Sequence, residues 1–282
     1  MGGGTYSSMN YAATASAKGY DSKPLSEIFQ QRNLSGTMNP LGVTLREARD
    51  SAEHPNSFPI ILGLDVTGSM GGIPHYLVKT GLPALMDKII EAGIKDPQLL
   101  FMGIGDHECD QAPLQIGQFE SSDQLLSKWL TELYIEQGGG GNDGESYLLA
   151  WFFAGLYTTT DQTDKRKKKG LLITIGDEPT LKQLPSSVQR KLMGAGQYKE
   201  QTATELLDKA REKYEVYHLH MLQGQGNSQQ TQDGWKQLMG ENVIFVQRKE
   251  DVAGVIADLV TKSQGAVAKS HESTDKKEED ML

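Results

Sequence analysis

The sequence predicts an α/β fold: a doubly wound, mostly parallel sheet of six strands flanked by helices, with one antiparallel edge strand. Three observations predict it. Apolar runs of strand length alternate along the chain with stretches in which apolar residues recur at helical spacing. Two of these runs follow each other without a helix between them, as antiparallel neighbours do. The composition, 37% hydrophobic and 23% charged, is typical of a chain with a packed core.

The elements follow in order along the chain. The six predicted strands are residues 58–64, 99–104, 114–116, 170–176, 216–222 and 243–246. The first is apolar almost throughout, as expected of a strand covered on both faces.

The helices lie between these strands. A helix follows the first strand, and Pro83 inside it should kink it, because proline lacks a backbone donor. Ser121 or Ser122 is expected to cap the next helix. The buried face of that helix is expected to be Leu125, Trp129, Leu130 and Leu133. Further helices are expected at 145–157, at 203–214 and after 252.

The chain divides into a predicted domain, residues 57–264, an N-terminal extension, residues 1–56, and a charged tail, residues 265–282. The first 20 residues are mostly Gly, Ser, Ala and Thr, which bury too little apolar surface to offset the entropy of ordering. We therefore expect a mobile arm there. Within the extension, residues 44–50 have a short helix-like pattern.

Composition excludes several functional classes. The net charge of −9 and the pI near 5.2 argue against nucleic acid or an anionic membrane as the partner, because a polyanion would meet a repulsive field. The single cysteine, Cys109, excludes an internal disulfide framework and fits a reducing compartment. The longest apolar run, 147–157, is about half the roughly 20 residues that a membrane-spanning helix needs. We expect a cytoplasmic protein.

Three loops rich in oxygen donors are expected at the carboxyl ends of the strands, where open α/β sheets bind ligands. The loops are 65–69, 138–146 and 175–179, and their candidate donors are Asp65, Thr67, Ser69, Asn142, Asp143 and Asp177. These donors are hydroxyl, carboxylate and amide oxygens, which hard cations such as Mg²⁺ prefer. The spacing of two residues within the first loop would turn three side chains toward one point. The pattern therefore favours a divalent metal site.

The stretch Asp65-Val-Thr-Gly-Ser69 resembles the Asp-x-Ser-x-Ser signature of the metal-ion-dependent adhesion site in von Willebrand factor type A domains. The resemblance covers roughly residues 57–264 and includes the order of the elements. It implies that Asp65, Thr67 and Ser69 surround a divalent metal, and that Asp177 is the family's distal aspartate. Adhesion-type members carry a threonine after the glycines of the second loop. Here that place is taken by Asn142, which aligns best by its distance to the next helix, or by Asp143, much as intracellular and microbial members carry an acid.

The resemblance implies a binding module and not an enzyme. In this family the metal, Mg²⁺ or in its place Mn²⁺ or Ca²⁺, keeps an open position that a carboxylate of a protein partner completes. Intracellular relatives often work beside AAA+ ATPases or in multiprotein assemblies. An AAA+ ATPase or a self-assembled complex is therefore the expected partner, with no nucleic acid and no membrane.

Two other functions use similar residues. The same stretch resembles Asp-Lys-Thr-Gly-Thr of the phosphorylated-aspartate pumps and, more loosely, the haloacid dehalogenase phosphatases. Asp65 would then be a nucleophile, Asp177 part of a Mg²⁺ loop, and one lysine of 167–169 a charge neutraliser. Position 67 lacks the second aspartate of the phosphatases, and the glycine loop would have no role. A metal-independent assembly protein is a second alternative, and any one loop on its own could be only a turn.

Four other segments are interpreted structurally. Residues 106–110 (Asp-His-Glu-Cys-Asp) are expected to form a solvated turn that could shape the binding rim. His218 and His220 alternate on one face of a strand and are expected to be structural. Residues 165–169 are expected to be a solvated basic run, and 224–234 a mobile rim loop.

Overall fold

The structure is a computed structural model that describes residues 4–68, 70–136 and 144–265. It confirms the predicted fold class. One sheet of six strands runs in the order β10-β9-β6-β2-β3-β4, and every neighbouring pair is parallel except β3 and β4. The strands are β2 Phe58–Asp65, β3 Pro97–Ile104, β4 Leu114–Ile116, β6 Gly170–Gly176, β9 Tyr214–Met221 and β10 Val243–Val246. The central strands are buried along their whole length.

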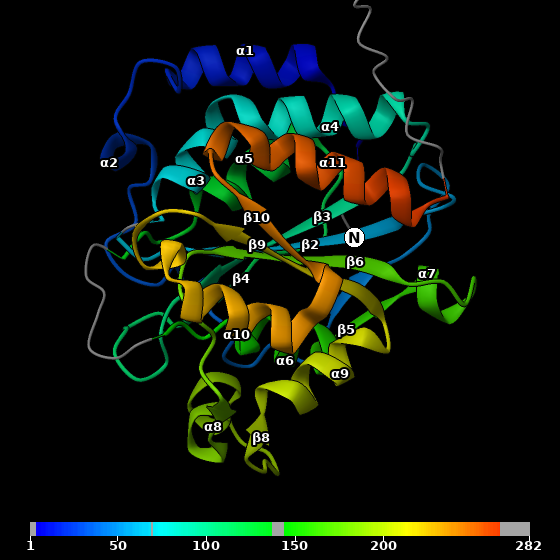
Figure 1. The fold of residues 1–282 in the computed structure, drawn as a ribbon. Coiled ribbons are helices and arrows are strands. Elements are labelled where there is room, and N and C mark those ends of the chain that lie inside the picture. The colour runs from blue at the N-terminus through cyan, green and yellow to red at the C-terminus, as the bar shows by residue number, and fades with distance from the viewer. Residues whose placement is uncertain (1–3, 69, 137–143, 266–282) are drawn as a thin grey trace, which may run out of the picture.

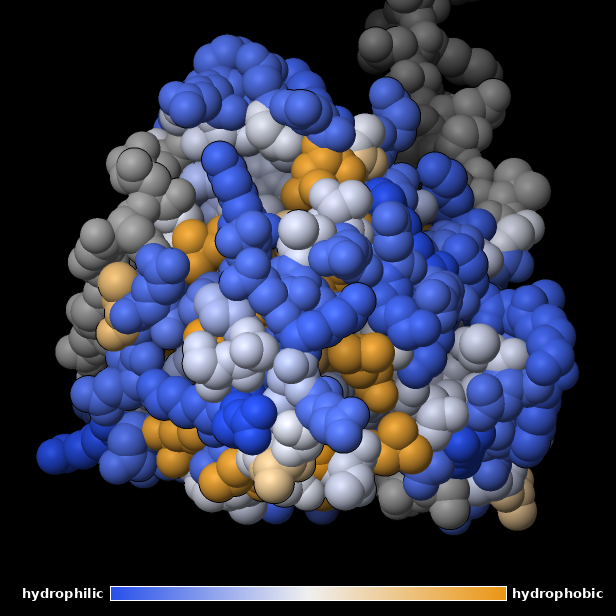
Figure 2. All heavy atoms as spheres, turned by 90° about the horizontal axis from the view of Figure 1, so that it is seen from below, coloured by the Kyte–Doolittle hydropathy of each residue, from blue (hydrophilic) through white to orange (hydrophobic). Residues whose placement is uncertain are grey.

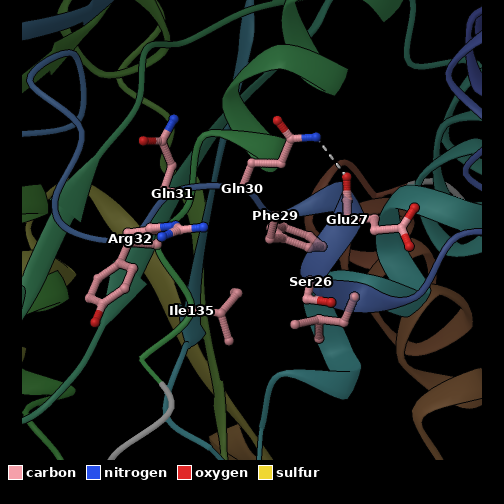
Figure 3. A pocket seen from close by; sticks show the side chains of 9 residues that line it. Ser26, Glu27, Phe29, Gln30, Gln31, Arg32 and Ile135 are labelled. Atoms are coloured by element: carbon pink, nitrogen blue, oxygen red, sulfur yellow. Dashed lines mark hydrogen bonds between the residues drawn. The ribbon is translucent and has the colours of Figure 1, made fainter.

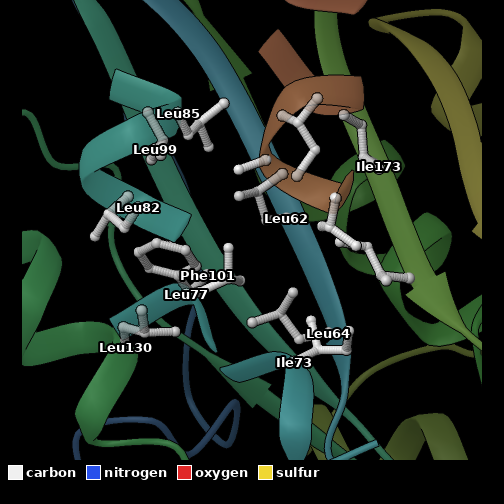
Figure 4. Close-up of a cluster of buried hydrophobic side chains, with 14 of the residues drawn as sticks. Leu62, Leu64, Ile73, Leu77, Leu82, Leu85, Leu99, Phe101, Leu130 and Ile173 are labelled. Carbon is white, nitrogen blue, oxygen red and sulfur yellow. The ribbon is translucent and has the colours of Figure 1, made fainter. Parts of the chain in front are cut away.

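Helices cover both faces of this sheet (Figure 1). On one face lie α1 Ser8–Lys18, α3 Gly72–Tyr76, α4 Leu82–Glu91, α5 Asp123–Thr131 and α11 Val252–Ser263. On the other lie α6 Leu148–Tyr157, α9 Ala203–Arg211 and α10 Gln229–Met239. Alternate residues of β2 enter different cores: Leu62 packs in the first, which Figure 4 shows, and Ile61 packs in the second. The seven- to eight-residue strands therefore separate two apolar layers.

The surface over the second layer is mainly hydrophilic. Seen from below, apolar residues appear there as separated groups among polar ones (Figure 2). This side also carries α8 Ser186–Met193 and the short antiparallel pair β7 Gln183–Leu184 and β8 Gln201–Thr202 (Figure 1). None of the helices in the described part of the chain has the length and apolar character needed to cross a bilayer.

The N-terminal residues form a packed helix where the sequence suggested a mobile arm. Helix α1 begins after Ser7, whose hydroxyl accepts from the N–H of Asn10 at 3.3 Å, and ends at Gly19 with φ of 69°. Tyr11 is 1% exposed, and its hydroxyl donates to the carbonyl of Val78 at 2.6 Å. The expectation of a mobile arm was wrong because it rested on the many small residues. The tyrosines of this segment supply a buried face.

Residues 44–50 are not helical. Strand β1 Arg46–Ala48 pairs in parallel with β5 Thr158–Thr160, between α6 and the short helix α7 Asp161–Asp164. Two ion pairs flank this pairing: Arg49 to Asp161 at 2.8 Å and Arg166 to Asp50 at 2.9 Å. Arg166 therefore does not belong to a solvated basic run, and its side chain is 24% exposed. Tertiary pairing overrides the weak helical pattern here.

Three helix details differ from expectation. The interruption expected at Pro83 is present one turn earlier, as a π-helical stretch at Leu77–Gly81, and Pro83 lies in the first turn of α4. Ser122 caps α5, as one of the two predicted serines, by accepting from the N–H of Leu125 at 3.4 Å, but Leu126 is buried in place of Leu125. Helix α6 begins at Leu148 and not at residue 145, because residue 145 makes a bridge to Thr180.

We predict that Tyr11→Ala lowers the free energy of unfolding by about 3 kcal/mol, because a buried aromatic ring is lost from the α1 contact. Tyr11→Phe, which removes only the hydrogen bond to Val78, should cost about 1 kcal/mol. Urea unfolding of both variants measures the difference. Equal stability of Tyr11→Ala and the wild type would mean that α1 does not pack on the domain.

Candidate metal site at the sheet edge

The carboxyl ends of β2, β3 and β6 meet at one edge of the sheet. Asp65 is the last residue of β2 and pairs in register with Ile104, the last of β3. Asp177 comes directly after β6. Glu145 joins this edge through backbone hydrogen bonds. Its N–H donates to the carbonyl of Pro179, and its carbonyl accepts from the N–H of Leu181, both at 2.9 Å. Segments expected in three separate loops therefore lie together.

The Asp65 carboxylate is fully buried and holds the first loop in a tight turn. Its Oδ1 accepts from the N–H of Thr67 at 3.0 Å and from the Thr67 hydroxyl at 2.6 Å. An aspartate that accepts from the backbone two residues later is a common turn-forming arrangement. The contact between Asp65 and Thr67 agrees with the predicted convergence of these two side chains.

The second carboxylate oxygen of Asp65 is held by Tyr147, which is not among the predicted site residues. The Tyr147 hydroxyl donates to Asp65 Oδ2 at 2.7 Å and accepts from the N–H of Glu178 at 3.4 Å. A Cβ on Gly176 would lie 1.8 Å from this hydroxyl, so only glycine fits there. The signal in the sequence was the glycine at the carboxyl end of β6, directly before Asp177.

Asp177 is a second buried acid at this edge, directly after the neighbouring strand β6. It is 1% exposed and accepts from Gln223 Nε2 at 3.4 Å. A Cβ on Gly226 would come within 3.2 Å of the Asp177 Cβ, so the segment Gly224–Asn227 packs closely against the acid. Burial, with the charge of Asp177 as a further cause, raises the pKa of Asp65 to about 6, against the hydrogen bonds from Thr67 and Tyr147.

The segment after β9 is ordered into helices, not a mobile loop. A 3₁₀ turn at Gly224–Asn227 leads directly into α10, whose Trp235 is 2% exposed. Trp235 Nε1 donates to the carbonyl of Glu178 at 3.0 Å. Glu178 is thus fixed from two sides, by Trp235 and by Tyr147.

Glu145 adds a buried acid that was not among the predicted ligands. It is 5% exposed, and its Oε2 has no hydrogen-bond partner among the described residues. Burial, followed by the charges of Asp65, Asp110 and Asp106, raises the pKa of Glu145 to about 10. A carboxyl group with an orphaned oxygen beside other acids fits a place where a cation offsets the charge.

The segment 106–110 forms part of the same acidic region. Asp106 is 3% exposed, so the expectation of a fully solvated turn is wrong for it. Asp110 Oδ2 accepts from the N–H of Asp106 at 2.7 Å. The neighbouring Glu136 is also buried: its N–H donates to the carbonyl of Val66 at 2.9 Å, and its Oε2 has no partner in the part of the chain described.

The two histidines of β9 are fully buried, and His218 packs in an aromatic layer. His218 stacks on Trp235 with ring centroids 3.6 Å apart, and its Nδ1 lies 2.9 Å from the Thr174 hydroxyl. Burial, and then the neighbouring His220, lowers the pKa of His218 well below its usual value, so the ring is neutral. This aromatic layer supports Tyr147, whose ring centroid is 5.0 Å from that of His218.

The donor set suits a hard cation. It consists of carboxylate and hydroxyl oxygens at a buried and strongly acidic edge, which Mg²⁺, Mn²⁺ and Ca²⁺ prefer. Within residues 4–68, 70–136 and 144–265, no three His, Cys, Asp or Glu side chains are grouped so that they alone could hold a metal. The predicted ligands Ser69, Asn142 and Asp143 lie outside the described residues. The structure thus joins Asp65 and Thr67 and places the buried Asp177 at the same sheet edge, and the full ligand set stays a prediction.

Comparison with known proteins finds similarity only among solved structures. No family model matches the chain, and the curated proteins contain no significant match. A pilus adhesin, SpaC from Lactobacillus rhamnosus GG in an open conformation, is 11% identical with a TM-score of 0.49, over 77% of this chain and 31% of the adhesin. A von Willebrand factor type A structure from Catenulispora acidiphila is 11% identical with a TM-score of 0.41, over 82% of this chain and 52% of the other chain. The chain thus spans about a third and a half of their lengths, and likeness this weak adds nothing to a functional assignment.

We predict a pH dependence for the metal-free protein. The pKa of Asp65 is about 6 in the folded state against 3.8 for the ordinary carboxyl, so the folded state binds the extra proton between these values. The contribution of Asp65 to stability is present below about pH 4 and is lost as the pH rises through 6. Urea unfolding in a chelator from pH 4 to 7 should show this fall. It should be smaller in Asp65→Asn and unchanged in a control, Asp208→Asn, whose side chain is 65% exposed. An unchanged slope in Asp65→Asn would contradict the assignment.

We also predict that Tyr147→Phe raises the pKa of Asp65 further, because a hydrogen bond that favours the charged carboxylate is lost. Titration of carboxyl-labelled aspartate by NMR in the metal-free protein measures this pKa. The matched control is Tyr214→Phe, another fully buried tyrosine, whose hydroxyl contacts Thr158 at 2.6 Å. A shift of equal size in both variants would point to general loosening and not to the Tyr147 hydroxyl.

Proposed function

We propose that this chain is a divalent-metal-dependent protein-binding module of the von Willebrand factor type A kind. Its sheet edge would hold Mg²⁺, or Mn²⁺ or Ca²⁺, and capture a carboxylate of a protein partner. The observation that carries the proposal is the buried Asp65 carboxylate at the end of the central strand, hydrogen-bonded to Thr67, with a second buried acid, Asp177, directly after the neighbouring strand β6. A buried acid beside a second acid is unfavourable unless a cation offsets the charge.

The residues of this edge would have different roles in holding the ion. Asp65, Thr67 and Asp177 would hold the ion together with the predicted ligands Ser69 and Asn142 or Asp143. Tyr147 orients Asp65 by binding its Oδ2, which leaves Oδ1 on the side of Thr67. When bound, the ion supplies a Lewis-acidic position for an incoming carboxylate. Because the family role is capture and not turnover, we propose no enzymatic activity.

The phosphohydrolase alternative fits the geometry less well. The Asp65 side chain is fully buried and both of its oxygens accept hydrogen bonds, which does not favour attack on a phosphate. The candidate lysines, 167–169, precede β6, whereas Asp65 and Asp177 lie at the carboxyl end of parallel strands. The length of β6 separates them by about 20 Å. A metal-independent assembly protein remains the second alternative.

The partner and the compartment are proposed from the sequence. The net charge of −9 supports a protein partner and not nucleic acid or an anionic membrane. An AAA+ ATPase or a self-assembled complex is proposed as the kind of partner, and the cytoplasm as the place.

The proposal predicts metal binding that depends on Asp65. Calorimetric titration with Mn²⁺ should give affinities at least roughly tenfold weaker in Asp65→Ala and in Asp177→Ala, and unchanged in the exposed control Asp208→Ala. Binding of Mn²⁺ to Asp65→Ala with wild-type affinity would contradict the site. Release of phosphate from p-nitrophenyl phosphate that Asp65→Asn abolishes would instead favour the phosphohydrolase.

A further inference from the structure

A groove of about 660 Å³ lies beside the candidate metal edge, between the N-terminal extension and the segment before the glycine loop. We call it the Arg32 groove. Its floor contains Leu25, Phe29 and Ile135, and Arg32 and Glu27 line it on opposite sides of Phe29 (Figure 3). The volume falls within the range of pockets that bind small ligands and side chains, roughly 300–1,000 Å³.

The groove is connected to the loop that follows Asp65. A Cβ on Gly71 would lie 3.1 Å from a methyl of Ile135 and 3.3 Å from one of Leu25, so both floor residues touch this loop. Ile135 is followed by Glu136, whose N–H donates to the carbonyl of Val66 at 2.9 Å. A chain bound at the metal edge would therefore need only a few residues, at about 3.3 Å each, to enter the groove.

Arg32 is a cation without a partner among the described residues. Its guanidinium is exposed and makes no hydrogen bond or ion pair with them, although the chain carries 37 acids against 28 Lys and Arg. Glu132, on the neighbouring segment, accepts from Gln31 at 3.1 Å and from Ser35 at 2.8 Å. An arginine fork that is free beside an apolar floor is suited to binding a carboxylate in two-pronged geometry.

We propose that the Arg32 groove binds an acidic and apolar segment of the protein partner, adjacent to the carboxylate captured at the metal edge. An apolar side chain packs on the Leu25, Phe29 and Ile135 floor, and a second carboxylate pairs with Arg32. Glu27 repels an acid from the other side, which orients the segment. This inference rests on the proposed function, since the metal edge is what would bring the partner to the groove.

The test begins with a random dodecapeptide library displayed on phage and selected against the full chain in Mg²⁺. We expect enriched sequences that combine acids with a large apolar residue, and a synthetic peptide of that sequence is then titrated by fluorescence anisotropy. Arg32→Glu should weaken its binding at least roughly tenfold. The matched control is Arg190→Glu, an equal charge reversal at an exposed position of α8, and it should leave binding unchanged. No enrichment, enrichment of basic sequences, or equal binding to Arg32→Glu would overturn the proposal.

A second set of measurements separates the groove from the metal site. If the peptide binds equally in EDTA and to Asp65→Ala but is lost in Arg32→Glu, the groove stands and the metal-bridged function fails. If binding needs the metal and Asp65 but ignores Arg32, the groove proposal fails and the function stands. Sedimentation of the full chain tests another occupant: self-association that Arg32→Glu abolishes would make a second copy of this chain the occupant and overturn the partner proposal.

Discussion

The hydrogen bond from the Tyr147 hydroxyl to the Asp65 carboxylate is the contact on which the sheet edge depends. It joins the end of the central strand to the residue before α6, and the same hydroxyl accepts from the backbone after β6. Without it, Asp65 Oδ2 would be buried and unpaired, at a cost of roughly 1–3 kcal/mol. The aromatic layer of His218 and Trp235 matters for the same reason, because it holds the tyrosine ring in place.

This arrangement gathers carboxyl groups where the fold can least solvate their charged forms. Asp65, Asp177, Glu145 and Asp106 are all buried at one edge, and the orphaned oxygen of Glu145 shows that described protein donors do not satisfy it fully. A protein keeps such a group when an ion or a partner completes it, or when instability there is useful. Metal binding and local stability should therefore be coupled at this edge.

Much of the fold could be predicted because the strands are buried on both faces. Their apolar runs stand out in the sequence, and four of the six predicted strands match the structure to within one residue at each end. Helix α1 and strand β1 were missed because what orders them is contact with distant residues: Val78 and α5 for the helix, and β5 for the strand. Local composition carries little trace of such contacts.

The site could be predicted only in part, for a related reason. Asp65 and Asp177 stand at strand ends, where topology brings side chains together whatever the details of the loops. Tyr147 lies within an apolar run, which predicts a core residue, and the pattern around Glu145 predicts the first turn of a helix. Their roles emerge only when the bridge between residue 145 and Thr180 shifts the start of α6.

The tight contact at Gly176 has an evolutionary consequence. A side chain of any size at this position would occupy the space of the Tyr147 hydroxyl. Positions 147 and 176 are therefore not free to vary separately: a homologue with alanine at 176 needs a smaller residue at 147, and it must hold its strand-end aspartate by other means. Paired change at these two positions would mark the branch of a phylogeny at which the aspartate acquired its tyrosine support.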